Sequence, residues 1–246
     1  MDFPTLAIIF AAVGAGALVK GATGMGMPLI AVPFIASVMG LQHAVVVLVI
    51  PILFSNAWQV VKFGAARHDP GMKFLVPMLV ACVVGIAGGV WFLTTAPERG
   101  LSIALGALLL AYFVFRIARP SFVVGSDAAM RWAIPAGLGA GILQGATGIS
   151  APIGVTFIHA QKFLRDAHVF AVSAMFLALG AAHLPSLWIA GLLKPEWVLQ
   201  GFLALIPIMI FMPVGQWLSS KLSQAAFDKM ILAFLGIIGL KLVLGI

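Results

Sequence analysis

The chain has 246 residues, of which 63% are hydrophobic and 9% are charged, and its mean hydropathy is +1.17. About 25% of the residues of a soluble domain are charged, so this composition excludes an ordinary soluble protein. The net charge of +7 comes from basic residues scattered through short loops between apolar runs. That placement is typical of membrane topology rather than of a nucleic-acid-binding surface. The single cysteine, Cys82, lies inside an apolar run, so no disulfide framework or thiolate metal site is expected.

Apolar runs follow one another along the whole chain. A membrane span needs about 20 mainly apolar residues. The first and fifth runs are too long for one span and too short for two. We therefore expect an all-α polytopic membrane protein with about eight to ten membrane segments. The runs cover residues 4–40, 43–62, 73–95, 100–118, 131–160, 167–192, 196–219 and 229–246.

The two long runs carry the same motif near their middles. Residues 20–28 read KGATGMGMP and residues 144–152 read QGATGISAP, so the shared motif recurs after 124 residues. Weaker matches follow, GVW at 89–91 with GQW at 215–217 and LG at 105–106 with LG at 235–236. These matches predict an internal duplication, a common construction in transporters, with a first repeat over 1–120 and a second over 121–246.

Each motif also predicts a break in a helix. Glycine costs about 1 kcal/mol in a helix interior and proline about 3 kcal/mol, so such a cluster ends one helix and starts another. Backbone freed in this way has to line a protein-enclosed cavity. The alternative is that the small residues only let helices pack closely. The predicted break residues are Gly21, Pro28, Gly145 and Pro152.

The distribution of Lys and Arg predicts the topology. If each long run crossed the membrane once, the loop charges would divide almost evenly, five against seven. If each long run is a broken hairpin that returns to its starting side, Arg99, Lys194 and Lys241 stay on the sparsely charged face. The positive-inside rule favours this second arrangement, with inverted repeats and both termini outside. The other face then collects Lys62, Arg67, Lys73, Arg116, Arg119, Arg131, Lys162, Arg165, Lys221 and Lys229.

Acidic residues are absent from the middle of the predicted spans. Proton-coupled pumps and cation transporters usually carry carboxylates there, so both classes are disfavoured, as is an aspartyl intramembrane protease. No metal-ligand spacing and no phosphate-binding loop occurs, and we expect no metal and no cofactor. The seven acidic residues, all in loops or at the ends of runs, are Asp2, Asp69, Glu98, Asp127, Asp166, Glu196 and Asp228.

The polar groups inside the predicted spans are therefore neutral or positively charged. Broken helices present unpaired N–H groups and the positive ends of helix dipoles, which favour an anion near the midplane between the two repeats. For Lys20 the alternative is snorkelling to an interface. For Asn56 it is helix–helix hydrogen bonding, and for His183 a structural role. The candidate substrate-binding residues are Lys20, Thr23, Gly24, Gly26, Asn56, Gln144, Thr147, Gly148, Ser150 and His183.

At the two breaks the sequence resembles the TauE/SafE sulfite exporters across the whole chain. The connector GLLKPEW at 191–197 is similar to one in the second half of that family. The resemblance implies a multi-pass protein of a bacterial-type inner membrane. It also implies export of a small anion such as sulfite, a sulfonate or a related organic acid, without enzymatic activity. The matching positions are Gly21, Gly24, Gly26, Pro28, Gly145, Gly148 and Pro152.

Two other functions fit parts of the sequence. Ser150 within GISA is a possible nucleophile of an intramembrane serine hydrolase, with His183 or His159 as its base. A non-catalytic accessory subunit of a membrane complex is the other alternative, and it would co-purify with its partners. The expected partners of an exporter are its small anionic substrate and the lipid bilayer, whereas nucleic acid is not expected and the oligomeric state stays open.

Overall fold

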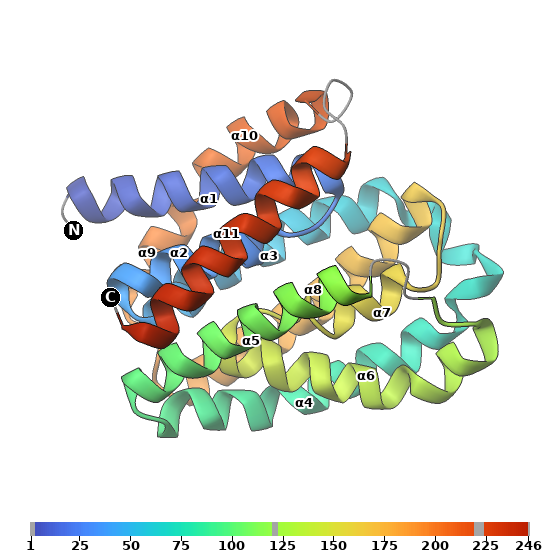
Figure 1. Cartoon of the computed structure of the whole chain (residues 1–246), viewed down its shortest axis with the longest axis horizontal. Helices are drawn as coiled ribbons and strands as arrows, with labels where there is room; N and C mark the ends of the chain where they lie inside the picture. The colour runs from blue at the N-terminus through green and yellow to red at the C-terminus, as the bar shows by residue number, and fades with distance from the viewer. Residues whose placement is uncertain (1–2, 120–122, 219–223, 246) are drawn as a thin grey trace. The chain divides into compact units, whose positions relative to one another are not determined.

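The computed structural model describes residues 3–119, 123–218 and 224–245, with the backbone alone at 126–127 and 224–230. Asp2 and Lys221 lie outside these residues, as do the side chains of Asp127, Asp228 and Lys229. The described chain is helical and contains no strand (Figure 1). Its α-helices are α1 (Phe3–Thr23), α2 (Met27–Met39), α3 (Leu41–Lys62), α4 (Leu75–Thr95), α5 (Glu98–Ala118), α6 (Ser126–Thr147), α7 (Gly154–His159), α8 (Arg165–Ile189), α9 (Pro195–Leu203), α10 (Leu205–Leu218) and α11 (Gln224–Leu244).

Six helical segments of the described chain are long and apolar enough to cross a membrane. The helices α2 and the Ile231–Leu244 part of α11 are apolar but shorter. This confirms the prediction of an all-α polytopic membrane protein. The six segments are Phe3–Thr23, Leu41–Lys62, Pro70–Thr95, Glu98–Ala118, Arg165–Ile189 and Pro195–Leu218.

Both predicted breaks are present, and they have the same local geometry. Helix α1 ends at Thr23 and α6 at Thr147, and a glycine with positive φ follows each: 80° at Gly24 and 72° at Gly148. Each of these glycines donates its N–H to a carbonyl four residues earlier, at 2.7 and 2.8 Å respectively. Glycine takes this left-handed helix cap without a Cβ penalty, which is why the motif ends a helix at this position.

Two features differ from the predicted runs. The polar piece between the second and third runs forms two 3₁₀ helices, η1 (Gly64–His68) and η2 (Pro70–Phe74). The seventh run is split into α9 and α10 around Ala204. Pro207 explains the split, because its ring would clash with the carbonyl four residues earlier in a continuous helix.

The described chain forms two compact units. Unit 1 comprises 1–51, 96–120 and 192–246, and unit 2 comprises 52–95 and 121–191. Each unit takes segments from both of the predicted repeats. The division at 1–120 and 121–246, and the inverted relation of the repeats, stay predictions.

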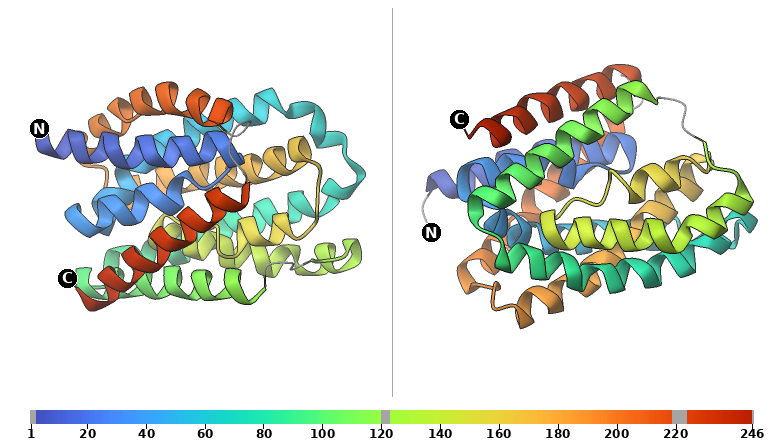
Figure 2. Two further views of the ribbon diagram at one scale, coloured as in Figure 1. Left: turned by 45° about the horizontal axis from the view of Figure 1, so that its top comes forward. Right: turned by 60° about the horizontal axis from the view of Figure 1, so that its bottom comes forward.

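In unit 1, α1 lies alongside α10, and α5 lies alongside α11 (Figures 1 and 2). The guanidinium of Arg99, at the start of α5, donates to the carbonyls of Leu242 at 3.1 Å and Val243 at 2.6 Å. These bonds hold the first turn of α5 to the end of α11. The start of α1 lies at the same end of unit 1.

In unit 2, α4 lies alongside α6, and α8 packs against α4 (Figure 1). The α4–α6 pair is held at close range by glycines. A Cβ at Gly145 would meet the carbonyl oxygen of Ile86, and a Cβ at Gly89 would meet that of Ile142. Close backbone approach of this kind is the ordinary use of small residues between membrane helices.

Unit 1 repeats this contact with the repeat partners of the same residues. A Cβ at Gly21 would meet the carbonyl oxygen of Met212, and one at Gly215 would meet that of Leu18. In the sequence Gly21 corresponds to Gly145, and Gly215 corresponds to Gly89. Each unit therefore pairs a broken helix from one half of the sequence with a helix from the other half. The partner of α6 is α4, from the third run, and the partner of α1 is α10, from the seventh run. The small residues thus bring helices together as well as ending them.

Candidate functional site

The first break lies in unit 1. Lys20 is in the last turn of α1 and is 3% exposed. The hydroxyl of Thr23 donates to the carbonyls of Val19 at 2.9 Å and Met25 at 2.7 Å, and it accepts from the Met25 N–H at 3.3 Å. The Thr23 hydroxyl thus forms its hydrogen bonds with backbone groups of the break itself. Gly26, with φ 97°, is the residue before α2.

The second break, in unit 2, uses Thr147 in the same way. Its hydroxyl lies 2.7 Å from the Leu143 carbonyl, to which it donates, and accepts from the Ile149 N–H at 3.2 Å. Threonine was predicted to offer its hydroxyl to a substrate. The structure gives both hydroxyls backbone partners, and a contact of either with substrate stays a prediction.

Four buried polar atoms in unit 2 have no hydrogen-bond partner among the described residues. One is His168 Nε2, near the start of α8, and the three at the second break are Gln144 Oε1, Ser150 Oγ and His183 Nε2. All three side chains are at most 1% exposed. His183 comes from α8, and it is hydrogen-bonded to the backbone of Gly145, which places its ring beside the break. Buried polar atoms are rarely left unsatisfied, so a set of three around one break points to a ligand or water.

A second polar contact in unit 2 joins α3 to α8. The Ser173 hydroxyl donates to Gln59 Oε1 at 2.9 Å, and both residues are buried. Asn56, one turn before Gln59, donates its Nδ2 to the Ile52 carbonyl of its own helix at 2.7 Å. The sequence pointed to Asn56, whereas Ser173 carried no signal because only the packing of α8 on α3 reveals its partner.

The predicted site residues thus fall into two groups. Lys20, Thr23, Gly24 and Gly26 belong to the break in unit 1. The rest lie in unit 2, where the break and the His183 ring are brought together: Asn56, Gln144, Thr147, Gly148, Ser150 and His183.

The electrostatics of both breaks favour an anion. Among the described side chains none of the buried polar groups is a carboxylate, and Lys20 is the buried residue with a formal charge. The described residues also hold no cluster of three His, Cys, Asp or Glu that would bind a metal ion. Neutral donors and a lysine without a buried carboxylate suit a negatively charged ligand.

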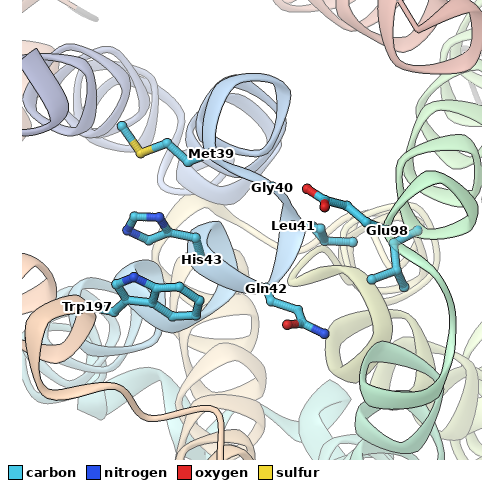
Figure 3. Close-up of a pocket in the computed structure, with 8 residues that line it drawn as sticks. Met39, Gly40, Leu41, Gln42, His43, Glu98 and Trp197 are labelled. Carbon is cyan, nitrogen blue, oxygen red and sulfur yellow. The ribbon is translucent and has the colours of Figure 1, made fainter.

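Sequence reasoning missed a recess of about 190 Å³ in unit 1 (Figure 3). It lies at the turn between α2 and α3, around Gly40, with Glu98 on one side and Trp197 on the other. His43 stacks on Trp197 with 4.5 Å between ring centroids, and its Nε2 lies 2.6 Å from Gln200 Oε1. These contacts fix α9 to the start of α3, and no sequence motif marks them.

Neither a curated protein nor a solved structure matches the chain. The family described as sulfite exporter TauE/SafE matches residues 8–242, a range that contains both breaks. This chain therefore belongs to the TauE/SafE sulfite exporter family of membrane transporters.

Proposed function

We propose that the protein exports a small anion, namely sulfite, a sulfonate or a related organic acid, across a bacterial-type inner membrane with both termini outside. Family membership and the absence of buried carboxylates among the described side chains support the proposal. The observation that carries it is the set of three unpartnered buried polar atoms at the second break, on Gln144, Ser150 and His183.

The chemistry of these groups suits an oxyanion. The Ser150 hydroxyl has a proton to donate. His183 bonds to the Gly145 backbone through its other ring nitrogen, so its Nε2 donates when the imidazole is charged. Rotation of the Gln144 amide exchanges its carbonyl for an N–H donor. Three donors around one break would replace part of the hydration of a sulfite or sulfonate oxygen. The charge of Lys20 favours an anion at the first break as well.

Export needs no coupled ion. An anion leaving an inside-negative cell gains about 2.3 kcal/mol per charge per 100 mV. The membrane potential is therefore a sufficient driving force for a monoanion, which agrees with a buried interior without carboxylates in the described chain.

The test is the current carried by purified protein in sealed proteoliposomes that are challenged in turn with sulfite, a short sulfonate, a carboxylate and chloride. We expect a saturating response that prefers the sulfur oxyanions and is weakened in Lys20→Ala. Equal response to all four anions, or none above protein-free vesicles, would contradict the proposal. The absence of any response would favour the accessory-subunit alternative, which co-purification of a stable partner would support.

The serine hydrolase gains no support from the geometry. A nucleophile and its base lie within hydrogen-bond reach of each other, about 2.6–3.2 Å, whereas Ser150 Oγ has no partner among the described residues. Labelling of the protein by a fluorophosphonate, lost in Ser150→Ala, would reverse this conclusion.

A further inference from the structure

Unit 2 contains a recess of about 590 Å³ that neither break uses. It is formed by η2, by the segment that leads into α6 and by the turn between α7 and α8. Its lining is mainly apolar, with Phe74, Phe163, Val123 and Met130 among its residues. Its cations are Lys73 and Lys162.

Contacts within unit 2 hold the walls of this recess in place. Phe163 stacks on Phe74 with 6.1 Å between ring centroids, and it lies so close to Gly71 that a Cβ there would be 2.7 Å from Phe163 Cε1. The N–H of Val124 donates to the Ala160 carbonyl at 3.0 Å, which ties the segment before α6 to the end of α7. The recess is therefore preformed by aromatic packing and backbone hydrogen bonds.

The two lysines are available to an anion. Both are exposed, and neither forms an ion pair with a described residue. The carboxylate nearest to Lys73 in sequence, that of Asp69, accepts from the Gly71 N–H at 2.8 Å and so caps the turn of η2. An anion in the recess would therefore find two ammonium groups that have no ion-pair partner among the described residues, beside the rings of Phe74 and Phe163.

The recess lies at the basic end of unit 2. All Lys and Arg of residues 52–95 and 121–191 stand at this end, namely Lys62, Arg67, Lys73, Arg131, Lys162 and Arg165. The other end, where α4, α6 and α8 finish, contains none of them. The positive-inside rule places such an end in the cytoplasm, next to the leaflet that carries anionic lipids.

An apolar path leads away from the recess along α6. Met130 lines the recess and is 47% exposed, and Ile134 follows one turn later at 54%. Residues four positions apart share one face of a helix. A molecule with an anionic head in the recess would therefore lay an apolar tail over this face.

From this juxtaposition we propose that the recess binds the phosphodiester headgroup of an anionic phospholipid of the cytoplasmic leaflet. Lys73 and Lys162 contact the phosphate, and an acyl chain follows Met130 and Ile134 along α6. Basic pockets at the cytoplasmic ends of membrane helices are known to hold acidic lipid headgroups. The proposal is independent of which anion the protein exports.

The test measures lipid retained by the purified full chain in detergent, with phosphatidylglycerol and phosphatidylcholine offered together. We expect phosphatidylglycerol to be retained in preference, and its affinity to fall about thirtyfold in Lys73→Gln/Lys162→Gln, since each lysine near an anionic surface contributes roughly fivefold. The matched control is Lys194→Gln/Lys241→Gln, which removes the same charge in unit 1 and should retain the lipid as the unmodified protein does.

A further variant separates loss of binding from loss of folding, and competition by inorganic phosphate or sulfite tells a lipid site from a small-anion site. Lys162 has a φ of 56°, so Lys162→Gly removes the charge and suits the backbone better; we expect it to fold normally and to bind phosphatidylglycerol more weakly. Undiminished binding by the double variant, or equal retention of both lipids, would overturn the proposal. So would displacement of the lipid by inorganic phosphate or sulfite at concentrations comparable to those of the lipid, because the recess would then be a small-anion site.

Discussion

At the residue scale, glycines set the distance between helices in both units, among them Gly21 and Gly215 in unit 1 and Gly89 and Gly145 in unit 2. The comparison of Gly88 with Gly89 on α4 shows how local this effect is. A Cβ at Gly89 would lie against the Ile142 carbonyl and 2.6 Å from the Ala146 nitrogen, whereas the nearest neighbour of a Cβ at Gly88 is an Ile142 side-chain carbon at 3.9 Å. Backbone atoms cannot move aside as a flexible side chain can.

Gly89→Ala should therefore destabilise the protein by about 1–3 kcal/mol, the usual cost of overpacking. Gly88→Ala, on the same helix and with the same change in composition, should be nearly neutral. Thermal unfolding of both variants in one detergent measures the difference. Equal midpoints for the two variants would show that α4 and α6 do not pack through Gly89.

The threonines of the two breaks show a limit of sequence reasoning at this scale. Their recurrence predicted a functional position, but the choice between a ligand and the local backbone depends on the φ and ψ angles of the break. In the structure the Thr147 hydroxyl satisfies the turn that follows α6.

Thr147→Val should lose about 1 kcal/mol of stability, the net value of an intramolecular hydrogen bond, and Thr147→Ser should retain most of it. The unfolding midpoints of the two variants measure this difference. If Thr147→Val kept full stability but raised the KM for the exported anion, the hydroxyl would belong to the substrate rather than to the break.

At the element scale, the sequence predicted the apolar runs and the places where the first and fifth are interrupted, because glycine and proline act through local backbone energetics. It did not predict the split between α9 and α10. Pro207 lies within a continuous apolar run, and nothing in that run marks a break. The clash of its ring with the preceding turn is seen only in the structure. The contact between His43 and Trp197 was out of reach because it joins residues 154 positions apart in the sequence.

The end of α11 depends on Arg99. Its guanidinium bonds to the carbonyls of Leu242 and Val243 in the last turn of the helix. Arg99→Gln should remove about 0.3–1 kcal/mol from the last turn, as is usual for a cation at a helix C-terminus.

Hydrogen exchange of the amide of Gly245, which donates to the Lys241 carbonyl at 2.8 Å, reports on this turn. We expect it to accelerate in Arg99→Gln and to be unchanged in Arg165→Gln, which removes an exposed arginine in unit 2. The same exchange rate in both variants would mean that the end of α11 is held by other contacts.

At the scale of the whole molecule, the duplication was visible in the sequence, but its consequence for packing was not. The glycine contacts show that each unit pairs helices from different halves of the sequence: α1 with α10, and α4 with α6. Periodicity and motif spacing report on single helices, and they carry no information on which helix faces which. The relation of the two breaks to a shared pathway accordingly stays a prediction.

The topology is open to a direct test on a Cys82→Ser background. Lys194→Cys, in the connector before α9, should react with a membrane-impermeant maleimide in intact cells, because positive-inside reasoning places it outside. Arg165→Cys, at the start of α8, should react only after the membrane is opened. Labelling with the opposite pattern would invert the assignment of the two faces, and labelling of both in intact cells would contradict the predicted spans.

The most direct test of the central claim, an anion exporter whose substrate contacts the second break, is the rate of sulfite efflux from proteoliposomes with a negative interior. The unmodified protein should give saturating efflux, and Ser150→Ala should lower it at least about tenfold, since a hydrogen bond to a charged group contributes about 1.5–3 kcal/mol. The matched control is Ser186→Ala. The Ser186 hydroxyl donates to the Ala182 carbonyl at 2.8 Å, so this variant should transport like the unmodified protein. Efflux no faster than from protein-free vesicles would contradict the function, and efflux unchanged in Ser150→Ala would contradict the site.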